Sequence, residues 1–242
     1  MRAAPDGYTL LIASSSNTIN ATLYDRINFV FLRDIAAVAG IISLPFVMVV
    51  NPSFPAKTVP EFIAHAKVNP GKISFGSPGI GTPGHVAGEL FKMMAGVELI
   101  HVPYRGGSAV VSDLLGGQVQ VFFGTTSLTA EQVRADKLRA LAVTGATRWE
   151  GLPDVPPVGD FVSGYEASSL FGLGAPKQTP SEIIDRLNRE INAALDDPTL
   201  KTRLIDLGGA LLAGSPADFS KLLADDTEKW SKVIRAAGMR AE

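Results

Sequence analysis

The alternation of short apolar segments with helical segments is the feature that most constrains how this chain can fold. Segments with strand patterns lie at 8–13, 72–77, 98–104, 118–123 and 138–144. Helical patterns lie between them at 58–68, 85–94 and 108–115. Because strand, helix and strand in succession normally build parallel pairing, this order predicts an α/β fold. We expect a parallel or mixed sheet with helices on both faces.

The last third of the chain is predicted to be mostly helical. A polar residue followed by proline indicates a helix start, and glycine indicates a stop. The start signals are Thr179-Pro180-Ser181-Glu182, Asp197-Pro198 and Ser215-Pro216-Ala217-Asp218, and the stop signals are Gly208-Gly209 and Gly238. The strand–helix rhythm breaks before this region, where 152–157 is expected to form a rigid proline loop and 168–175 is apolar and uncharged.

The most membrane-like segment of the chain is 35–50. It is shorter than the ~20 residues that span a bilayer, and it contains Gly40, Ser43 and Pro45. It is therefore expected to form two short buried strands joined by a bend. The first residues of the chain have the pattern neither of a signal peptide nor of a transit sequence.

Composition excludes several classes of function. The 22 Lys and Arg residues are balanced by 24 Asp and Glu residues, and a net charge of −2 argues against a nucleic-acid groove. The absence of cysteine excludes disulfides, cysteine-ligated metals, iron–sulfur clusters and thiol catalysis. His65, His85 and His101 are scattered without ligand spacing, and no nucleophile elbow, Walker lysine loop or zinc-protease motif occurs. No metal site is therefore expected.

The sharpest local signal is a glycine loop between a strand and a helix, in which Gly79, Gly81 and Gly84 form G-x-G-x-x-G. This context suits a dinucleotide fingerprint, which makes an NADP-dependent oxidoreductase the alternative function. Against it, Pro83 removes an amide donor, and the end of the next strand, 102–105, carries no ribose-binding acid. The more general prediction is an anion site, because backbone N–H groups at a helix N-terminus attract negative charge. A tight turn that serves packing alone is the third alternative.

Several other loops follow expected strands. They are 14–18, 104–108, 124–127 and 144–147. In open α/β sheets a ligand binds beyond the carboxyl ends of the strands. These loops offer Ser, Thr, Asn and Gly donors, a candidate helix cap at Ser108 and the cation of Arg105, whose other explanation is a solvated loop charge. Because they hold almost no general acid, base or nucleophile, they favour binding over catalysis.

A series of motifs runs through the whole chain in order. It comprises Pro5-Asp6-Gly7-Tyr8-Thr9-Leu10-Leu11, Asn51-Pro52-Ser53-Phe54-Pro55, Pro70-Gly71-Lys72-Ile73-Ser74-Phe75-Gly76-Ser77, His85-Val86-Ala87-Gly88-Glu89-Leu90-Phe91, His101-Val102-Pro103-Tyr104-Arg105-Gly106, Asp113-Leu114-Leu115-Gly116-Gly117-Gln118-Val119, Leu138-Arg139-Ala140-Leu141-Ala142-Val143-Thr144 and Leu152-Pro153-Asp154-Val155-Pro156. The series resembles the Bug family, the TctC-type extracytoplasmic receptors of tripartite tricarboxylate transporters. The resemblance implies a type II periplasmic binding protein of the Venus flytrap kind, with a ligand cleft between two α/β lobes.

The resemblance also implies a function and partners. Such a receptor is not an enzyme and has no cofactor. It captures a small carboxylate (a dicarboxylate, a tricarboxylate or an acidic amino acid) in the periplasm for a membrane permease. Lobe 1 would comprise 1–45 with 168–242, and lobe 2 would comprise 46–167. Where many members have Asp-Asn, this chain has Gly124-Thr125, which favours a plain di- or tricarboxylate over a ligand with an ammonium group.

The family's ligand-holding loops correspond here to 14–17, 79–85 and 104–107, with 125–127 and 144 nearby. The ligand-binding residues so implied are Ser14, Ser15, Ser16, Asn17, Gly79, Gly81, Thr82, His85, Tyr104, Arg105, Gly106, Thr125, Thr126 and Thr144. Family members also carry a further segment before the first motif. The resemblance therefore implies a truncated chain, whose strand at 10–13 has an open apolar edge.

Overall fold

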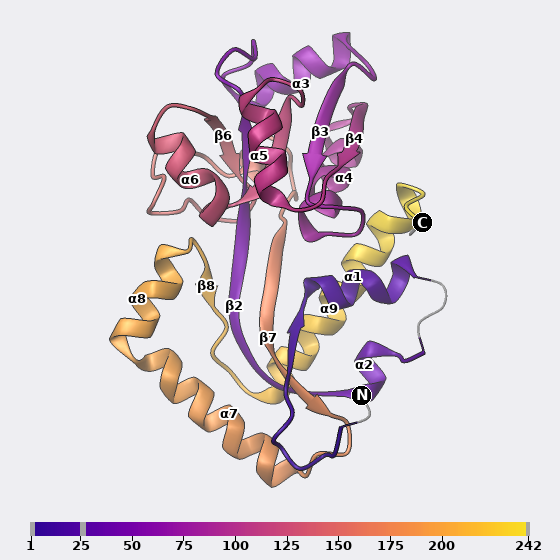
Figure 1. Ribbon diagram of the computed structural model, residues 1–242, viewed down its shortest axis with the longest axis vertical. Helices are drawn as coiled ribbons and strands as arrows, with labels where there is room; N and C mark the ends of the chain where they lie inside the picture. The colour runs from indigo at the N-terminus through magenta and orange to yellow at the C-terminus, as the bar shows by residue number, and fades with distance from the viewer. Residues whose placement is uncertain (1–2, 25–27, 241–242) are drawn as a thin grey trace. The chain divides into compact units, whose positions relative to one another are not determined.

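The chain forms two compact units, each with strands and helices (Figure 1), in a computed structural model that describes residues 3–24 and 28–240. Unit 1 comprises residues 1–44 and 169–242, and unit 2 comprises Pro45–Ser168. Both units are α/β, which confirms the predicted fold class. Unit 2 is continuous in sequence, whereas unit 1 is assembled from both ends of the chain.

Unit 2 is built on a mixed sheet. Its strands, in spatial order, are β6 (Arg139–Val143), the second half of β2 (Ile35–Val50), β5 (Val121–Thr125), β3 (Ile73–Ser77) and β4 (Leu99–Pro103). β3 is parallel to both β4 and β5, while β2 is antiparallel to β5 and β6. The carboxyl ends of β3, β4, β5 and β6 therefore lie at one edge of the sheet.

The longer helices of unit 2 each follow a strand. They are α3 (Val59–Val68), α4 (Pro83–Ala95), α5 (Gly107–Leu115) and α6 (Thr126–Arg134), and a short 3-10 helix, η1, covers Val158–Asp160. α4 lies close against the sheet because Gly88 has no side chain: a Cβ there would lie 2.4 Å from the Phe75 ring. The rings of Phe75 and Phe91 both pack against Phe123, with centroids 6.5 and 5.6 Å apart. This aromatic packing holds the middle of α4 against the sheet.

Unit 1 contains the first half of β2 with β1 (Leu11–Ser14), β7 (Ser168–Pro176) and β8 (Ala210–Leu211). β1 pairs antiparallel with β7, β7 lies beside β2, and β8 pairs with β2. The helices are α1 (Ser15–Leu23), α2 (Phe31–Asp34), α7 (Ser181–Asp196), α8 (Pro198–Asp206) and α9 (Pro216–Ala236). Phe219 and Trp230 are buried, so the apolar face of α9 lies in the core of this unit.

The segment 35–50 forms one strand, and the prediction of two strands joined by a bend is wrong. Pro45, which suggested the bend, has no N–H to donate to a strand ladder. It lies between the residues of β2 that pair with β8, Ile42 and Ser43, and the residues that pair with β5, Phe46–Val50. The missing donor therefore falls between two ladders, and the strand continues through it.

None of the helices that the structure describes combines the length and the apolar character of a membrane span.

Two predicted loops are helix starts. The polar stretch at 14–18 opens α1, because the Asn17 Oδ1 atom accepts the Ser14 N–H (2.9 Å) and allows the helix to begin directly after β1. The stretch at 124–127 opens α6, whose first turn is tied by the Thr129 hydroxyl donating to the Thr125 carbonyl oxygen (3.0 Å). In both cases the polar side chains, which were predicted to form a loop, hydrogen-bond backbone groups at the start of a helix.

Two predicted helix caps are also wrong. Thr179 does not cap α7: its hydroxyl is buried without a hydrogen-bond partner among the described residues, and Pro180 occupies the N-cap. Ser108 does not cap α5, because that helix begins one residue earlier, with Gly106 at the N-cap.

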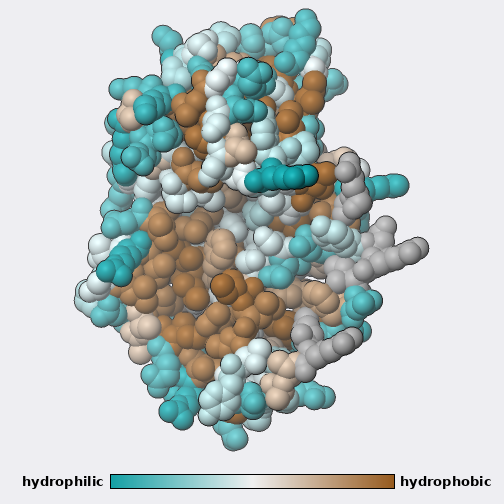
Figure 2. Space-filling view, in the orientation of Figure 1, coloured by the Kyte–Doolittle hydropathy of each residue, from teal (hydrophilic) through white to brown (hydrophobic). Residues whose placement is uncertain are grey.

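Apolar side chains are exposed on unit 1. Figure 2 shows a broad brown area over the strands of this unit. β1 is the edge strand in the order of the described strands, and the exposed fractions of Leu10, Leu11 and Ile12 are 39%, 37% and 65%. An apolar edge strand of this kind can pair with a second chain.

We expect Ile12→Lys to reduce self-association of the chain, because a charge on an edge strand opposes edge-to-edge pairing. Size-exclusion chromatography with light scattering at increasing protein concentration measures the effect. Val68→Lys, at an exposed apolar position of α3, is the matched control. Equal association of the two variants would contradict the assignment of the contact to β1.

Candidate functional site

Three helices of unit 2 begin at one edge of its sheet. α4, α5 and α6 follow β3, β4 and β5, and their N-cap residues are Thr82, Gly106 and Thr125. Because β3 is parallel to both neighbours, the three starts lie along the carboxyl edge (Figure 1). The structure thus brings together the predicted loops 79–85 and 104–107 with Thr125.

The first turns of these helices lack any compensating charge. In the described part of the chain, none of the three has a cap side chain bonded to a first-turn N–H or an acidic residue in its first turn. In contrast, the predicted caps Asp197 and Ser215 are confirmed at α8 and α9, with oxygen–nitrogen distances of 2.9 and 3.2 Å. Thr58 likewise caps α3, at a distance of 3.3 Å. Since a bare helix N-terminus carries free N–H donors and roughly half a positive charge, this edge attracts an anion.

Glycine shapes the loop between β3 and α4. Gly79 and Gly81 have φ values of +145° and +73°, which residues with a side chain rarely adopt. A Cβ on Gly84 would lie 2.8 Å from the Phe123 carbonyl oxygen, so the first turn of α4 reaches β5 only because a glycine is there. The glycine spacing therefore determines both the turn and its close approach to the sheet.

One amide of this loop is used inside the protein. The Gly81 N–H donates to Nδ1 of His85 (3.1 Å), and His85 has an exposed fraction of 4%. The N–H groups of Ile80 and Gly84 have no acceptor among the described residues. Ile80, which sequence reasoning did not select, therefore offers a donor, while the N–H of Gly81 is occupied.

Two of the three scattered histidines meet in the fold. The rings of His85 and His101 stack with centroids 3.6 Å apart and planes 11° apart. Burial, followed by the charges of His101 and Lys92, lowers the pKa of His85 from its usual 6.5 to about 3. Burial, followed by Lys92, lowers the pKa of His101 to about 4. Both rings are therefore neutral at neutral pH.

Ser77 and His101 are site residues that sequence reasoning missed. Ser77 Oγ lies 2.6 Å from Nε2 of His101, a distance that also suits a nucleophile and its base. However, Ser77 is completely buried and its hydroxyl also bonds both the N–H and the carbonyl oxygen of Gly79, so the pair is part of the loop's support. The alternation of side chains along a strand could have indicated this pair. Phe75 pairs with His101 in the parallel register, and Ser77, two residues after Phe75, lies on the same face of the sheet.

The side chains after β4 differ in their availability to a ligand. The Tyr104 hydroxyl donates to the Asp113 carboxylate (2.8 Å), and partial burial together with this carboxylate raises the pKa of Tyr104 to about 12. Arg105 is exposed and makes no ion pair among the described residues. Arg105 is therefore the available cation at this edge, whereas the Tyr104 hydroxyl is turned toward α5.

The threonines after β5 and β6 also differ. Thr125, at the N-cap of α6, is partly exposed, and its hydroxyl lies 3.0 Å from the Ser127 hydroxyl. Thr126 is buried. Thr144 is buried as well, and its Oγ1 bonds the N–H and carbonyl oxygen of Phe46 and the carbonyl oxygen of Ala167. The Thr144 hydroxyl therefore ties backbone segments of unit 2 together.

The predicted residues of unit 1 stand at the start of α1. Ser15 is buried and its Oγ accepts the Leu170 N–H (2.9 Å). Ser14 and Asn17 bond each other, with 3.3 Å between the Ser14 Oγ and Asn17 Oδ1 atoms. Ser16 is exposed. In this group the side chain of Ser16 is the one directed to solvent, while the others support the helix start.

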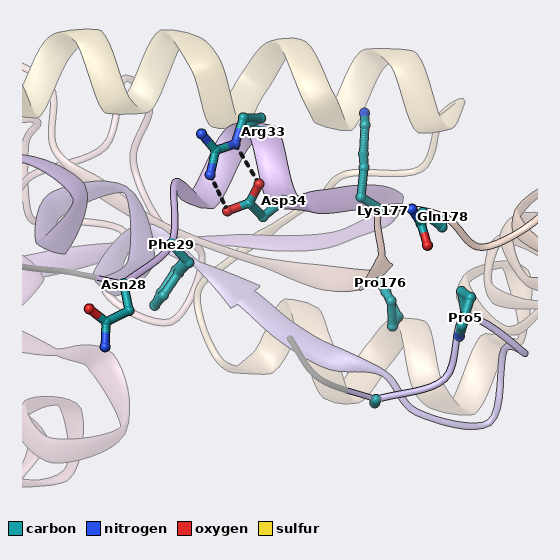
Figure 3. A pocket seen from close by; sticks show the side chains of 9 residues that line it. Pro5, Asn28, Phe29, Arg33, Asp34, Pro176, Lys177 and Gln178 are labelled. Carbon is teal, nitrogen blue, oxygen red and sulfur yellow. Dashed lines mark hydrogen bonds and ion pairs between the residues drawn. The ribbon is translucent and has the colours of Figure 1, made fainter.

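A cavity of about 1060 Å³ in unit 1 is a second candidate (Figure 3). It is lined by Ala3, Pro5, Asn28, Phe29, Arg33, Asp34, Pro176, Lys177 and Gln178. Figure 3 shows the Arg33 guanidinium turned toward Asp34, and the shortest nitrogen–oxygen distance between them is 2.6 Å. The hydrogen bond from Arg33 lowers the pKa of Asp34 to about 2. Asp34 thus already neutralises the arginine of this cavity, whose other lining cation is Lys177.

Comparison with known proteins finds one family throughout the chain. Residues 1–239 match the family described as "Tripartite tricarboxylate transporter family receptor". A UPF0065 protein from the tcbD–tcbE intergenic region of a Pseudomonas species is 37% identical over 235 residues, which are 96% of this chain and 70% of that protein. Protein BugT of Bordetella pertussis is 32% identical over 244 residues, which are 99% of this chain and 74% of BugT.

Solved structures of similar fold include two with a bound carboxylate. R. palustris Rpa4515 with adipate superimposes with a TM-score of 0.89 and 32% identity, covering 99% of this chain and 81% of that protein. MatC of Rhodopseudomonas palustris with bound malate gives a TM-score of 0.81 and 25% identity, covering 96% and 81%.

The fold defines a periplasmic binding protein, the class to which the structurally similar BugD belongs. Within that class, the chain belongs to the TctC family of tripartite tricarboxylate transporter receptors, which includes the Bug proteins. The resemblance drawn from the motifs is confirmed.

We expect the histidine stack to make stability depend on pH. An unfolded histidine takes up a proton below pH ~6.5, whereas His101 in the folded chain stays neutral down to about pH 4. The unfolded state therefore binds more protons as the pH falls through this window, and the free energy of unfolding decreases. His101→Gln should flatten that dependence by up to ~1.4 kcal/mol per pH unit.

Urea unfolding between about pH 4.5 and 7.5 measures this slope. His65→Gln, in α3 and outside the stack, is the control. A slope in His101→Gln as steep as in the unmodified chain would show that the His101 ring is not held neutral by its surroundings.

Proposed function

We propose that this chain binds a small di- or tricarboxylate in the periplasm and delivers it to the membrane permease of a tripartite tricarboxylate transporter. The observation that carries the proposal is the row of three uncapped helix starts, α4, α5 and α6, at one edge of unit 2. In this proposal units 1 and 2 serve as the two lobes of the receptor.

The donors at this edge suit a carboxylate. Each carboxylate oxygen accepts more than one hydrogen bond, and the N–H groups of Ile80 and Gly84 need acceptors. Arg105 adds a charge-assisted bond, which contributes roughly 1.5–3 kcal/mol.

Gly124, the residue before Thr125, bears on the class of ligand. Gly124 has no carboxylate to bind an ammonium group, and an added Cβ would lie 2.4 Å from the Phe122 ring and 2.6 Å from the Thr129 methyl group. Packing thus fills the space in which an acidic side chain would begin. We therefore propose plain di- and tricarboxylates, in preference to acidic amino acids.

The alternative, an NADP-dependent oxidoreductase, has less support. Pro83 occupies the first position of α4, where a pyrophosphate would need an N–H. The Gly81 N–H is already bonded to His85. The family consists of receptors, and we propose that this chain too binds its ligand without converting it.

Titration calorimetry with adipate, malate, succinate and citrate tests the function, with glutamate and NADPH as comparisons. We expect at least one di- or tricarboxylate to bind more tightly than glutamate, and NADPH not to bind. A chain that binds NADPH and none of the carboxylates would overturn the proposal in favour of the oxidoreductase.

We expect Thr125→Asp to lower carboxylate affinity at least about tenfold while keeping the fold intact. Aspartate is a good N-cap, so α6 is not destabilised. Its charge repels the ligand, since unit charges roughly 5 Å apart near a protein surface interact by about 3 kcal/mol. Thr58→Asp is the matched control, because Thr58 caps α3, which follows the opposite end of the sheet. Equal affinity in both variants would place the ligand away from α6.

A further inference from the structure

We infer that His85 and His101 are positioning residues for the carboxylate site: they hold the loop 77–82 in its binding shape and do not contact the ligand themselves. This inference rests on the proposed function. It assigns to His85 a different role from the ligand contact that the resemblance implies, and it adds His101 and Ser77, which lie in the motifs but are not among the implied ligand-binding residues.

His85 holds one side of the loop. Its Nδ1 accepts the Gly81 N–H (3.1 Å), and Gly81 has the positive φ that turns the chain toward α4. An acceptor at Nδ1 requires the proton of the neutral ring to be on Nε2. Nε2 lies 3.8 Å from a Glu89 oxygen and His85 is buried, so neither ring nitrogen is directed at a ligand in solvent.

His101 holds the other side through Ser77. Its Nε2 lies 2.6 Å from the Ser77 hydroxyl, which in turn bonds Gly79 at both the N–H (3.2 Å) and the carbonyl oxygen (3.0 Å). The Thr82 hydroxyl donates to that same carbonyl oxygen (2.8 Å). The loop is thus tied at Gly79 and at Gly81, and the free N–H of Ile80 lies between the two tied residues.

Stacking joins the two ties into one unit. The rings of His85 and His101 lie 3.6 Å apart, and the Phe75 ring lies 4.8 Å from His101 on the sheet. The charged groups facing the pair are Glu89 and Lys92, which bond each other at 2.8 Å. A proton on His85 Nδ1 would remove the acceptor of Gly81 and place a charge against its stacking partner. The loop therefore keeps its shape while both rings are neutral.

Isosteric variants separate positioning from direct contact. Asparagine places a polar atom near the Nδ1 position of histidine, and glutamine places one near Nε2. If His85 acts through Gly81, the affinity for the best-binding carboxylate should be at least about tenfold lower in His85→Gln than in His85→Asn. For His101, which acts through Nε2, the order should reverse, with His101→Asn weaker than His101→Gln. His65→Asn and His65→Gln are controls and should match each other.

The amide of Gly81 gives a readout that needs no ligand. In the unmodified chain at neutral pH, nuclear magnetic resonance should show an unprotonated His85 Nδ1 and slow hydrogen exchange at Gly81. Exchange should stay slow in His85→Asn and become faster in His85→Gln.

The outcomes separate the inference from the function on which it rests. A protected Gly81 amide in a chain that binds none of the carboxylates overturns the proposed function alone. Equal Gly81 exchange in the two His85 variants overturns the positioning role. Tighter binding by His85→Gln than by His85→Asn means that Nε2 contacts the ligand, and it likewise overturns the inference. Should His85→Gln fail to fold, the His101 pair decides by the same comparison.

Discussion

The parallel pairing of β3 with β4 and β5 is the constraint on which the chemistry of unit 2 depends. Ser77 pairs with Pro103 in register, and Phe75 pairs with Val121 on the other side. This pairing brings to one edge three helix starts that are well separated in sequence. Each start alone is an ordinary feature of an α/β protein. Together, without caps or acidic residues, they make an edge whose polarity matches a carboxylate.

Local patterns predicted much of the fold. The strand–helix order, the caps Asp197 and Ser215 and the α/β class all follow from patterns in short segments, and they are confirmed. Where prediction failed, the deciding partner was distant. Pro45 does not interrupt β2 because the partners on its two sides belong to different strands, β8 and β5. A local pattern does not show which ladder a residue joins.

In the candidate site, too, local features were predictable from the sequence and contacts between distant segments were not. Glycine spacing alone predicted the loop before α4, because the positive φ values of this loop and its close approach to the sheet both require glycine. The stack of His85 on His101 was missed, since it requires the register of β3 and β4 and the placement of α4 over Phe75. Likewise, sequence did not show that the hydroxyls of Tyr104 and Thr144 bond other parts of the protein. The roles of the fourteen implied ligand-binding residues stay predictions.

The discontinuity of unit 1 has a consequence for biosynthesis. Unit 2 is a single run of chain, Pro45–Ser168, whereas β1 of unit 1 pairs with β7, and α1 packs with α9 at the far end of the sequence. During synthesis from the N-terminus, unit 2 has all of its own strands before the partners of β1 leave the ribosome. β1 and the first half of β2 therefore reach their partners β7 and β8 only after the middle of the protein has been synthesised. We expect β1 to need protection from other chains until β7 has been synthesised.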